Sequence, residues 1–128
     1  MTDPKVISTP DAPAAIGPYS QAKVANGFVF TAGQVPIDPA TNTLIEGDFG
    51  EQVLLVLKNI NAILKAAGTD AGRAVKFTVF LKDFSNYAVL NEVFTEFFSG
   101  TEPPARSALQ VSKLPLDAEV EIECIAAL

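Results

Sequence analysis

Val75-Lys76-Phe77-Thr78-Val79-Phe80-Leu81 is a run of mostly β-branched and aromatic residues, a composition typical of a β-strand. Side chains alternate between the two faces of a strand, so the apolar residues at positions 75, 77, 79 and 81 share one face. Phe80 lies on the other face, which indicates that this side of the sheet is covered too. The segment therefore predicts a strand that is buried on both faces, with the other elements arranged around it.

A helix is predicted on each side of this strand along the chain. Residues 48–67 place apolar side chains at helical spacing, with Asp48 as the N-cap and Gly68 as the terminator. Residues 86–98 have a largely aromatic stripe at the same spacing, and Gly100 ends them. Both helices are amphipathic, so each is expected to pack one face against the sheet.

The other strands are predicted before the first helix and after the second. Asn26-Gly27 favours a type I′ turn, which predicts a hairpin of two antiparallel strands. The chain before Pro18 is rich in proline, and we expect it to be irregular. The expected strands are 20–25, 28–34, a short one at 43–45, and two C-terminal strands at 105–111 and 119–127.

This order predicts one α+β domain over residues 1–128, with a mixed β-sheet and two helices on one face. The opposite face would carry Phe80, Ala108 and Ile125, which a solvated surface does not favour. We therefore expect another copy of the chain to cover that face.

Composition excludes several classes of function. Nine basic and fifteen acidic residues give a net charge of −6, which argues against nucleic acid as the main partner. The chain has no histidine, which excludes His-based triads and His-ligated metals, and its one cysteine, Cys124, cannot form an intramolecular disulfide. The N-terminus lacks a leader pattern and no apolar run is long enough to span a membrane, so we expect a cytoplasmic protein with no membrane partner.

Arg106 is the leading functional candidate, because a permanently charged guanidinium within an apolar strand needs an anion to face it. It can bind a substrate carboxylate through two parallel hydrogen bonds, or form an internal ion pair with Glu119, Glu121 or Glu123. If the two C-terminal strands form a hairpin, Glu121 falls opposite Arg106, where it could activate a water molecule. Spacing alone slightly favours the internal ion pair.

Three further residues carry weaker signals. The hydroxyl of Tyr19 can bind a ligand or anchor a turn. Asn91 lies beside the apolar stripe of the second helix, and this pattern favours a surface position. Cys124 alternates with apolar residues, which indicates a small core side chain and not a nucleophile.

Several blocks of the sequence occur in an order that resembles a known family. The blocks are Ala12-Pro13-Ala14-Ala15-Ile16-Gly17-Pro18-Tyr19-Ser20-Gln21, Phe30-Thr31-Ala32-Gly33-Gln34-Val35-Pro36, Lys76-Phe77-Thr78-Val79-Phe80-Leu81-Lys82-Asp83, Asn91, Pro104-Ala105-Arg106-Ser107 and Val120-Glu121-Ile122-Glu123. Together they closely resemble the YjgF/Rid family of reactive-intermediate deaminases, over essentially the whole chain.

The resemblance implies a chorismate-mutase-like fold assembled as a homotrimer, with sites between subunits. It also implies hydrolysis of reactive 2-imino acids or their enamine tautomers, such as 2-iminobutanoate and 2-iminopropanoate, to 2-oxo acids and ammonia. The family uses no metal and no organic cofactor. A 2-imino acid is already electrophilic, so a fixed cation and an oriented water form a sufficient site.

Carried over by motif, Arg106 would bind the substrate carboxylate and Glu121 would act on the water. Tyr19, Gly33 and Asn91 would line the pocket, some of them from a neighbouring subunit. Two substitutions in the presumed wall bear on substrate preference. They are Ala32, where a serine is common, and Ala108, where a cysteine often follows Arg-Ser.

Three other functions remain open for such a chain. A non-catalytic module could bind 2-oxo acids through Arg106 without accelerating any reaction. An endoribonuclease or translation inhibitor, an activity ascribed to some relatives, is disfavoured by the net charge of −6 and the absence of histidine. No feature of the sequence supports a chaperone-like role.

Overall fold

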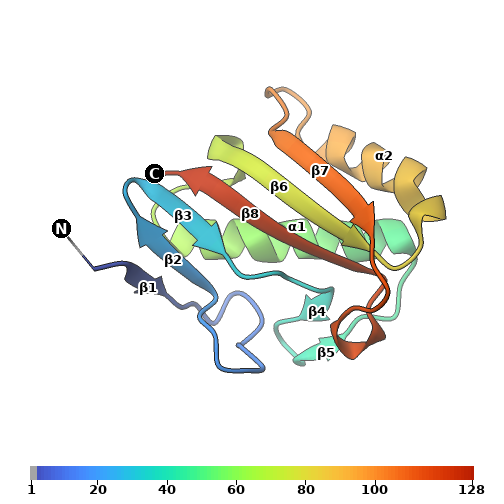
Figure 1. Ribbon diagram of the computed structural model, residues 1–128, viewed down its shortest axis with the longest axis horizontal. Helices are drawn as coiled ribbons and strands as arrows, with labels where there is room; N and C mark the ends of the chain where they lie inside the picture. Colours follow the sequence, from blue (N-terminus) through green and yellow to red (C-terminus); the bar gives the residue numbers. More distant parts are fainter. Residues whose placement is uncertain (1–2) are drawn as a thin grey trace.

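The computed structural model describes residues 3–128, which form a β-sheet with two helices packed on one of its faces (Figure 1). The six-stranded sheet has the order β1-β2-β3-β8-β6-β7. Its strands are β1 (Lys5–Ile7), β2 (Ala22–Ala25), β3 (Phe28–Thr31), β6 (Ala74–Leu81), β7 (Ala105–Gln110) and β8 (Val120–Ala127). The helices are α1 (Phe49–Ala66) and α2 (Tyr87–Phe97), and a separate ribbon pairs β4 (Ile37–Asp38) with β5 (Thr43–Leu44). The predicted α+β class, with a mixed sheet and both helices on one face, is confirmed.

Helix α1 forms where its capping residue and apolar spacing predict it. The Asp48 side chain accepts a hydrogen bond from the backbone N–H of Glu51 at 2.8 Å, which satisfies one free donor of the first turn. Its apolar stripe, which includes the fully buried Val53 and Ile60, faces the sheet. Gly68 follows with a φ of 93°, the left-handed conformation that ends many helices.

Strand β6 lies inside the sheet, and its residues from Phe77 to Leu81 that face the helices are buried as predicted. Val75 is 45% exposed, against the prediction, because the pairing with β8 shifts register there. The strand pairs antiparallel with β8 on one side and parallel with β7 on the other. Phe77 points toward the helices with none of its surface exposed, and its ring meets Phe94 at 5.6 Å and Phe98 at 5.7 Å, both edge-on. These aromatic contacts hold α2 over β6 and β7. The position of α2 in turn determines where the Arg106 side chain is held.

The expected hairpin between the two C-terminal strands is wrong. β7 and β8 lie on opposite sides of β6 and do not pair with each other (Figure 1). The physical reason is that α2 connects β6 to β7 as a crossover, so these two strands run parallel and side by side. Arg106 is therefore aligned with Phe77 on the helix-covered face, whereas Glu121 is aligned with Phe80 on the other face.

The N-terminal half differs from the predictions in strands β1, β3 and β4, of which β4 was not predicted at all. Lys5–Ile7 form strand β1, which pairs with β2, although the sequence predicts irregular chain there. Strand β3 ends at Thr31, earlier than expected. The backbone N–H of Cys124 donates its hydrogen bond to the Thr31 hydroxyl at 3.0 Å and not to a backbone carbonyl, so the ladder with β8 stops there. The chain rejoins β8 at Gln34, which exchanges two backbone hydrogen bonds with Ile122 at 2.8 and 3.0 Å. This return places Gly33 beside Glu121.

Candidate functional site

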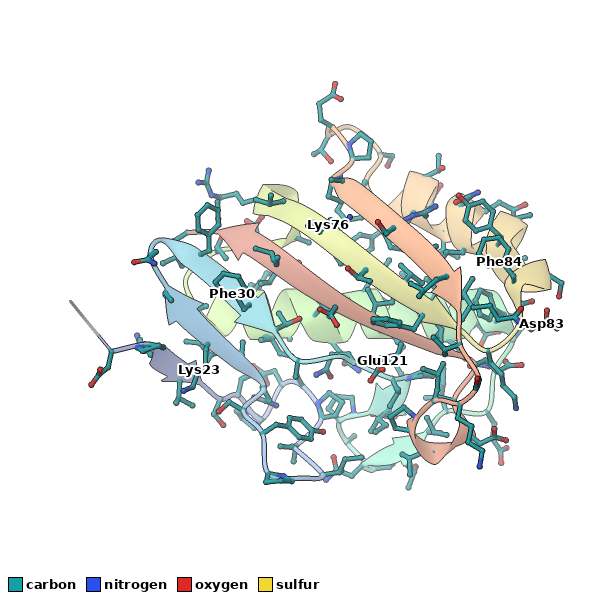
Figure 2. The ribbon with its side chains drawn as sticks, in the orientation of Figure 1. Lys23, Phe30, Lys76, Asp83, Phe84 and Glu121 are labelled. Atoms are coloured by element: carbon teal, nitrogen blue, oxygen red, sulfur yellow. The ribbon has the colours of Figure 1, made fainter. Side chains whose placement is uncertain are left out.

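Glu121 lies on the sheet face away from the helices, as Figure 2 shows, and its side chain is partly buried. Burial raises the pKa of its carboxyl group above the ordinary value, and the negative charge of Glu123 raises it further. A carboxylate with a raised pKa is a better proton acceptor than an ordinary surface glutamate.

Gly33 allows the Glu121 side chain to lie directly over the backbone. A Cβ atom at position 33 would stand 2.7 Å from Oε2 and 2.8 Å from Cδ of Glu121, closer than real contacts permit. The absence of a side chain at this position is what makes room for the carboxylate. The structure therefore couples two residues that the sequence separates by 88 positions.

A cavity of ≈ 320 Å³ opens beside Glu121 and Gly33, and Tyr19 and Ala32 contribute to its wall. The Tyr19 hydroxyl accepts a hydrogen bond from the backbone N–H of Ile16 at 3.1 Å, so it anchors a turn. Its ring remains 46% exposed and can still contact a ligand. Four of the residues predicted for the site thus meet at one cavity.

Arg106 lies on the other face of the sheet, in a cradle formed by α2. Its Nη2 donates to Asn91 Oδ1 at 2.6 Å and contacts the Tyr87 hydroxyl at 3.3 Å. The guanidinium carbon lies 4.8 Å from the centre of the Phe94 ring and 5.5 Å from that of Tyr87. All these partners are neutral, so they orient the guanidinium without compensating its charge.

The internal ion pair that spacing favoured is wrong. Within residues 3–128 the one ion pair joins Lys82 to Asp117 at 3.0 Å, and no glutamate of β8 reaches Arg106. The reason is the position of β6, which separates the strand of Arg106 from the strand of the glutamates. Arg106 retains a full positive charge that no carboxylate of the described chain neutralises.

A second cavity, of ≈ 500 Å³, lies beside Arg106 between the end of α2 and the start of β7. Asn91 and Phe94 belong to its wall on α2, and Pro103 and Pro104 belong to its wall on the connecting loop. Ala108 faces the same side of the sheet as Arg106 but packs against the core, aligned with Val79. Ala108 therefore does not line this cavity, and its predicted place on the face opposite the helices is wrong, because Leu109 is the residue aligned with Phe80.

The predicted site residues thus fall into two groups, which one chain does not bring together. Glu121, Gly33, Ala32 and Tyr19 form the first group, and Arg106 with Asn91 forms the second. Asn91 is partly exposed, as its position beside the apolar stripe predicts, but the pattern gives no sign that its amide oxygen accepts a hydrogen bond from Arg106. Sequence reasoning missed Tyr87 and Phe94, although they lie four residues before and three residues after Asn91, which places all three on one side of α2.

Cys124 is a core residue, as its pattern predicts. It is buried, and burial raises the pKa of its thiol to about 12, so the thiolate is not populated near neutral pH. Among residues 3–128, no cluster of three acidic, histidine or cysteine side chains could hold a metal ion. No helix in the same range is long and apolar enough to cross a bilayer.

Comparison with known proteins places the chain among relatives over almost its whole length. A family model described as Endoribonuclease L-PSP matches residues 9–128. A RutC family protein of Pyrococcus horikoshii is 52% identical over 122 residues, which cover 95% of this chain and 96% of the relative. The 2-iminobutanoate/2-iminopropanoate deaminase of Mus musculus is 48% identical over 122 residues, covering 95% of this chain and 90% of the mouse protein. A crystal structure of a Rid family protein from Yersinia pestis has a TM-score of 0.95 at 47% identity, covering 98% of this chain and 100% of that one.

Proposed function

This chain belongs to the Endoribonuclease L-PSP family, which is the YjgF/Rid family that its motifs resemble, and from its site we propose that it hydrolyses 2-imino acids to 2-oxo acids and ammonia. The observation that carries the proposal is the uncompensated charge of Arg106, held in a fixed orientation by neutral groups. A guanidinium in that state is a binding site for a carboxylate, the one charged group that every 2-imino acid carries.

The proposed reaction uses Glu121 as the proton-transfer group. Glu121 accepts a proton from a water molecule as the water oxygen attacks the imine carbon, and it returns that proton to the nitrogen, which gives a tetrahedral amino alcohol. Glu121 then passes the hydroxyl proton of the amino alcohol to the nitrogen in the same way, the carbon–nitrogen bond breaks, and ammonia leaves as the carbonyl group of the 2-oxo acid forms. The raised pKa of Glu121 suits both steps, because the same group must accept and return one proton.

The two groups of site residues must come from different copies of the chain. Arg106 and Glu121 lie on opposite faces of one sheet, so a small substrate cannot contact both within a single chain. The face that carries Glu121 also exposes apolar side chains, including Phe30 at 45% and Leu109 at 42%. We propose that a second copy covers this face and that three copies form a ring, each site taking Arg106 from one chain and Glu121 from the next.

The function is tested by forming 2-iminobutanoate in situ with a threonine dehydratase and following the decay of the imine. Wild type should accelerate the decay, and Arg106→Ala should reduce kcat/KM by about 100-fold or more, since a buried charged hydrogen-bond pair contributes several kcal/mol. Lys82→Ala, which removes an exposed cation from the Lys82–Asp117 pair, is the matched control and should leave the rate unchanged. Wild-type decay at the buffer rate would refute the proposal.

A non-catalytic 2-oxo-acid sensor is the second candidate, because the same cradle around Arg106 would bind a 2-oxo acid carboxylate. Glu121→Gln separates the two functions. If the protein is an enzyme, this variant should still bind 2-oxobutanoate in calorimetry but lose turnover. If the wild type binds 2-oxobutanoate and accelerates no imine, the sensor function replaces the enzymatic one.

A further inference from the structure

A groove with a volume of ≈ 320 Å³ lies between α1 and α2, the two helices that cover one face of the sheet (Figure 1). Its floor is apolar and its rim is acidic. The floor is formed by Leu54, Val93 and Phe97, and the rim by Glu51, Glu92 and Glu96. We propose that this α1–α2 groove binds a basic amphipathic helix of another protein. An apolar side chain of that helix enters the floor, and its lysine or arginine side chains reach the rim.

The floor consists of apolar side chains that the fold leaves open to solvent. Leu54 is 37% exposed, and Val93 and Phe97 are only partly buried at the margin of the core. The ring of Phe97 packs edge-on against that of the buried Phe98 at 5.1 Å, so a core residue supports it. Apolar side chains from two helices that meet in one concavity indicate a contact surface, which a single exposed leucine would not. A groove of this kind is a common receptor for an amphipathic helix.

The charge of the rim determines the chemistry of the partner. Glu51, Glu92 and Glu96 are exposed, and no lysine or arginine lines the groove. Among residues 3–128 the one ion pair joins Lys82 to Asp117, so the rim carboxylates have no ion-pair partner in that part of the chain. Lysine and arginine can lay their aliphatic stems on an apolar floor while their charged ends reach such carboxylates. An acidic segment would place like charges against the rim.

The length of the groove limits the size of the contact. Its lining residues span about one helical turn on α1, from Glu51 to Leu54, and about one turn on α2 near Glu92 and Glu96. A groove of this length accommodates one apolar anchor with a basic residue on either side. Such a contact belongs to the weak and transient class of interactions.

The groove is separate from the proposed reaction site. Val93 follows Asn91 by two residues, which is about 200° around a helix, so the groove and the cradle of Arg106 lie on opposite sides of α2. A second copy on the sheet face that carries Glu121 would also leave the helices uncovered. A partner can therefore bind in the groove while the site beside Arg106 stays open.

Binding can be tested with a fluorescein-labelled peptide of about four helical turns, with leucine at helical spacing and lysine at the other positions. Fluorescence anisotropy should show saturable binding to the wild-type protein, and the binding should weaken as the salt concentration rises. The same peptide with glutamate in place of lysine should not bind. No saturable binding of the lysine peptide, or equal binding of the two peptides, would overturn the inference.

Three variants separate binding in the groove from general attraction to an acidic protein. Leu54→Gln removes an apolar contact without a change in net charge and should weaken binding about fivefold. Glu96→Gln should weaken it about threefold. Glu102→Gln makes the same charge change at an exposed position of the loop before β7 and should leave the affinity unchanged. Equal losses in the two glutamate variants, or wild-type affinity in a folded Leu54→Gln, would overturn the inference.

Backbone amide shifts in NMR spectra locate the bound peptide. We expect the largest shifts within residues 50–54 and 92–97. Shifts centred on β3, where Phe30 is 45% exposed, would place the peptide on the other face of the sheet and contradict the proposal. If Leu54→Gln lowers the mass of the protein in light scattering, a second copy of the chain occupies the groove in place of a basic helix.

Discussion

A methyl group added at position 33 should reduce the rate of catalysis and leave the stability of the fold nearly unchanged. In Gly33→Ala, the new Cβ would stand 2.7 Å from Glu121 Oε2 and 2.8 Å from its Cδ. Ordinary contacts begin near 3.4 Å, so the carboxylate must move by about 0.7 Å or more. The atoms that must move belong to the far end of a flexible side chain, so the fold can absorb the change.

The expected loss is therefore kinetic. A displacement of this size at a reacting group reduces rates by about 10- to 100-fold, whereas the free energy of unfolding should change by less than about 1 kcal/mol. Imine decay and urea denaturation, measured on the same preparations, give the two quantities. Gly50→Ala is the matched control, because its added Cβ would meet its neighbours at 3.4–3.7 Å, an ordinary contact distance.

A shorter acidic side chain at position 121 shows whether displacement of the carboxylate causes the loss of rate. Glu121→Asp withdraws the carboxylate from position 33, so Gly33→Ala should have a smaller effect in the Glu121→Asp background than in wild type. Full activity in Gly33→Ala would be one contrary result, and equal effects in both backgrounds would be the other. Either result would mean that the position of the Glu121 carboxylate does not limit the reaction.

Three further variants have defined outcomes. Glu123→Gln removes the charge that helps to raise the Glu121 pKa, so the acid limb of the kcat–pH profile should move to lower pH. Because the Glu121 pKa is raised from 4.5 in the folded state, the free energy of unfolding falls as pH rises through the interval above 4.5, and Glu123→Gln should reduce that fall in urea titrations. Tyr87→Phe removes the hydroxyl 3.3 Å from Arg106 and should raise KM about threefold with a smaller change in kcat, which steady-state kinetics will show. Asp48→Ala removes the 2.8 Å N-cap bond and should reduce the free energy of unfolding by about 1 kcal/mol without changing activity, whereas an unchanged denaturation midpoint would contradict the capping role.

The sequence predicts the fold well where local chemistry determines structure. The Asp48 cap, the apolar stripe of α1 and the Asn26-Gly27 turn depend on neighbours in the chain, and all three are present; Asn26 and Gly27 have φ values of 52° and 82°. Strand β1 was missed because its three residues gain their order only by pairing with β2. No local pattern records such a distant partner.

The site residues also divide into features that the sequence predicts locally and features that depend on distant partners. Arg106 and Glu121 were identified as candidates because charged groups in apolar strands are conspicuous in a sequence. Their relative position was mispredicted, because adjacent strands in the chain need not be adjacent in the sheet, and β6 separates them. The contact of Gly33 with Glu121 depends on the Gln34–Ile122 pairing, a long-range feature that spacing along the chain does not reveal.

If each site takes Arg106 from one chain and Glu121 from another, mixing of subunits should restore activity to two inactive variants. Arg106→Ala and Glu121→Gln should each be inactive alone. After the two variants are unfolded together in equal amounts and refolded, about one quarter of the sites should contain both native residues and the mixture should hydrolyse 2-iminobutanoate at about one quarter of the wild-type rate. If both residues act from the same chain, every site carries one defect, and a mixture as inactive as its components would contradict the account.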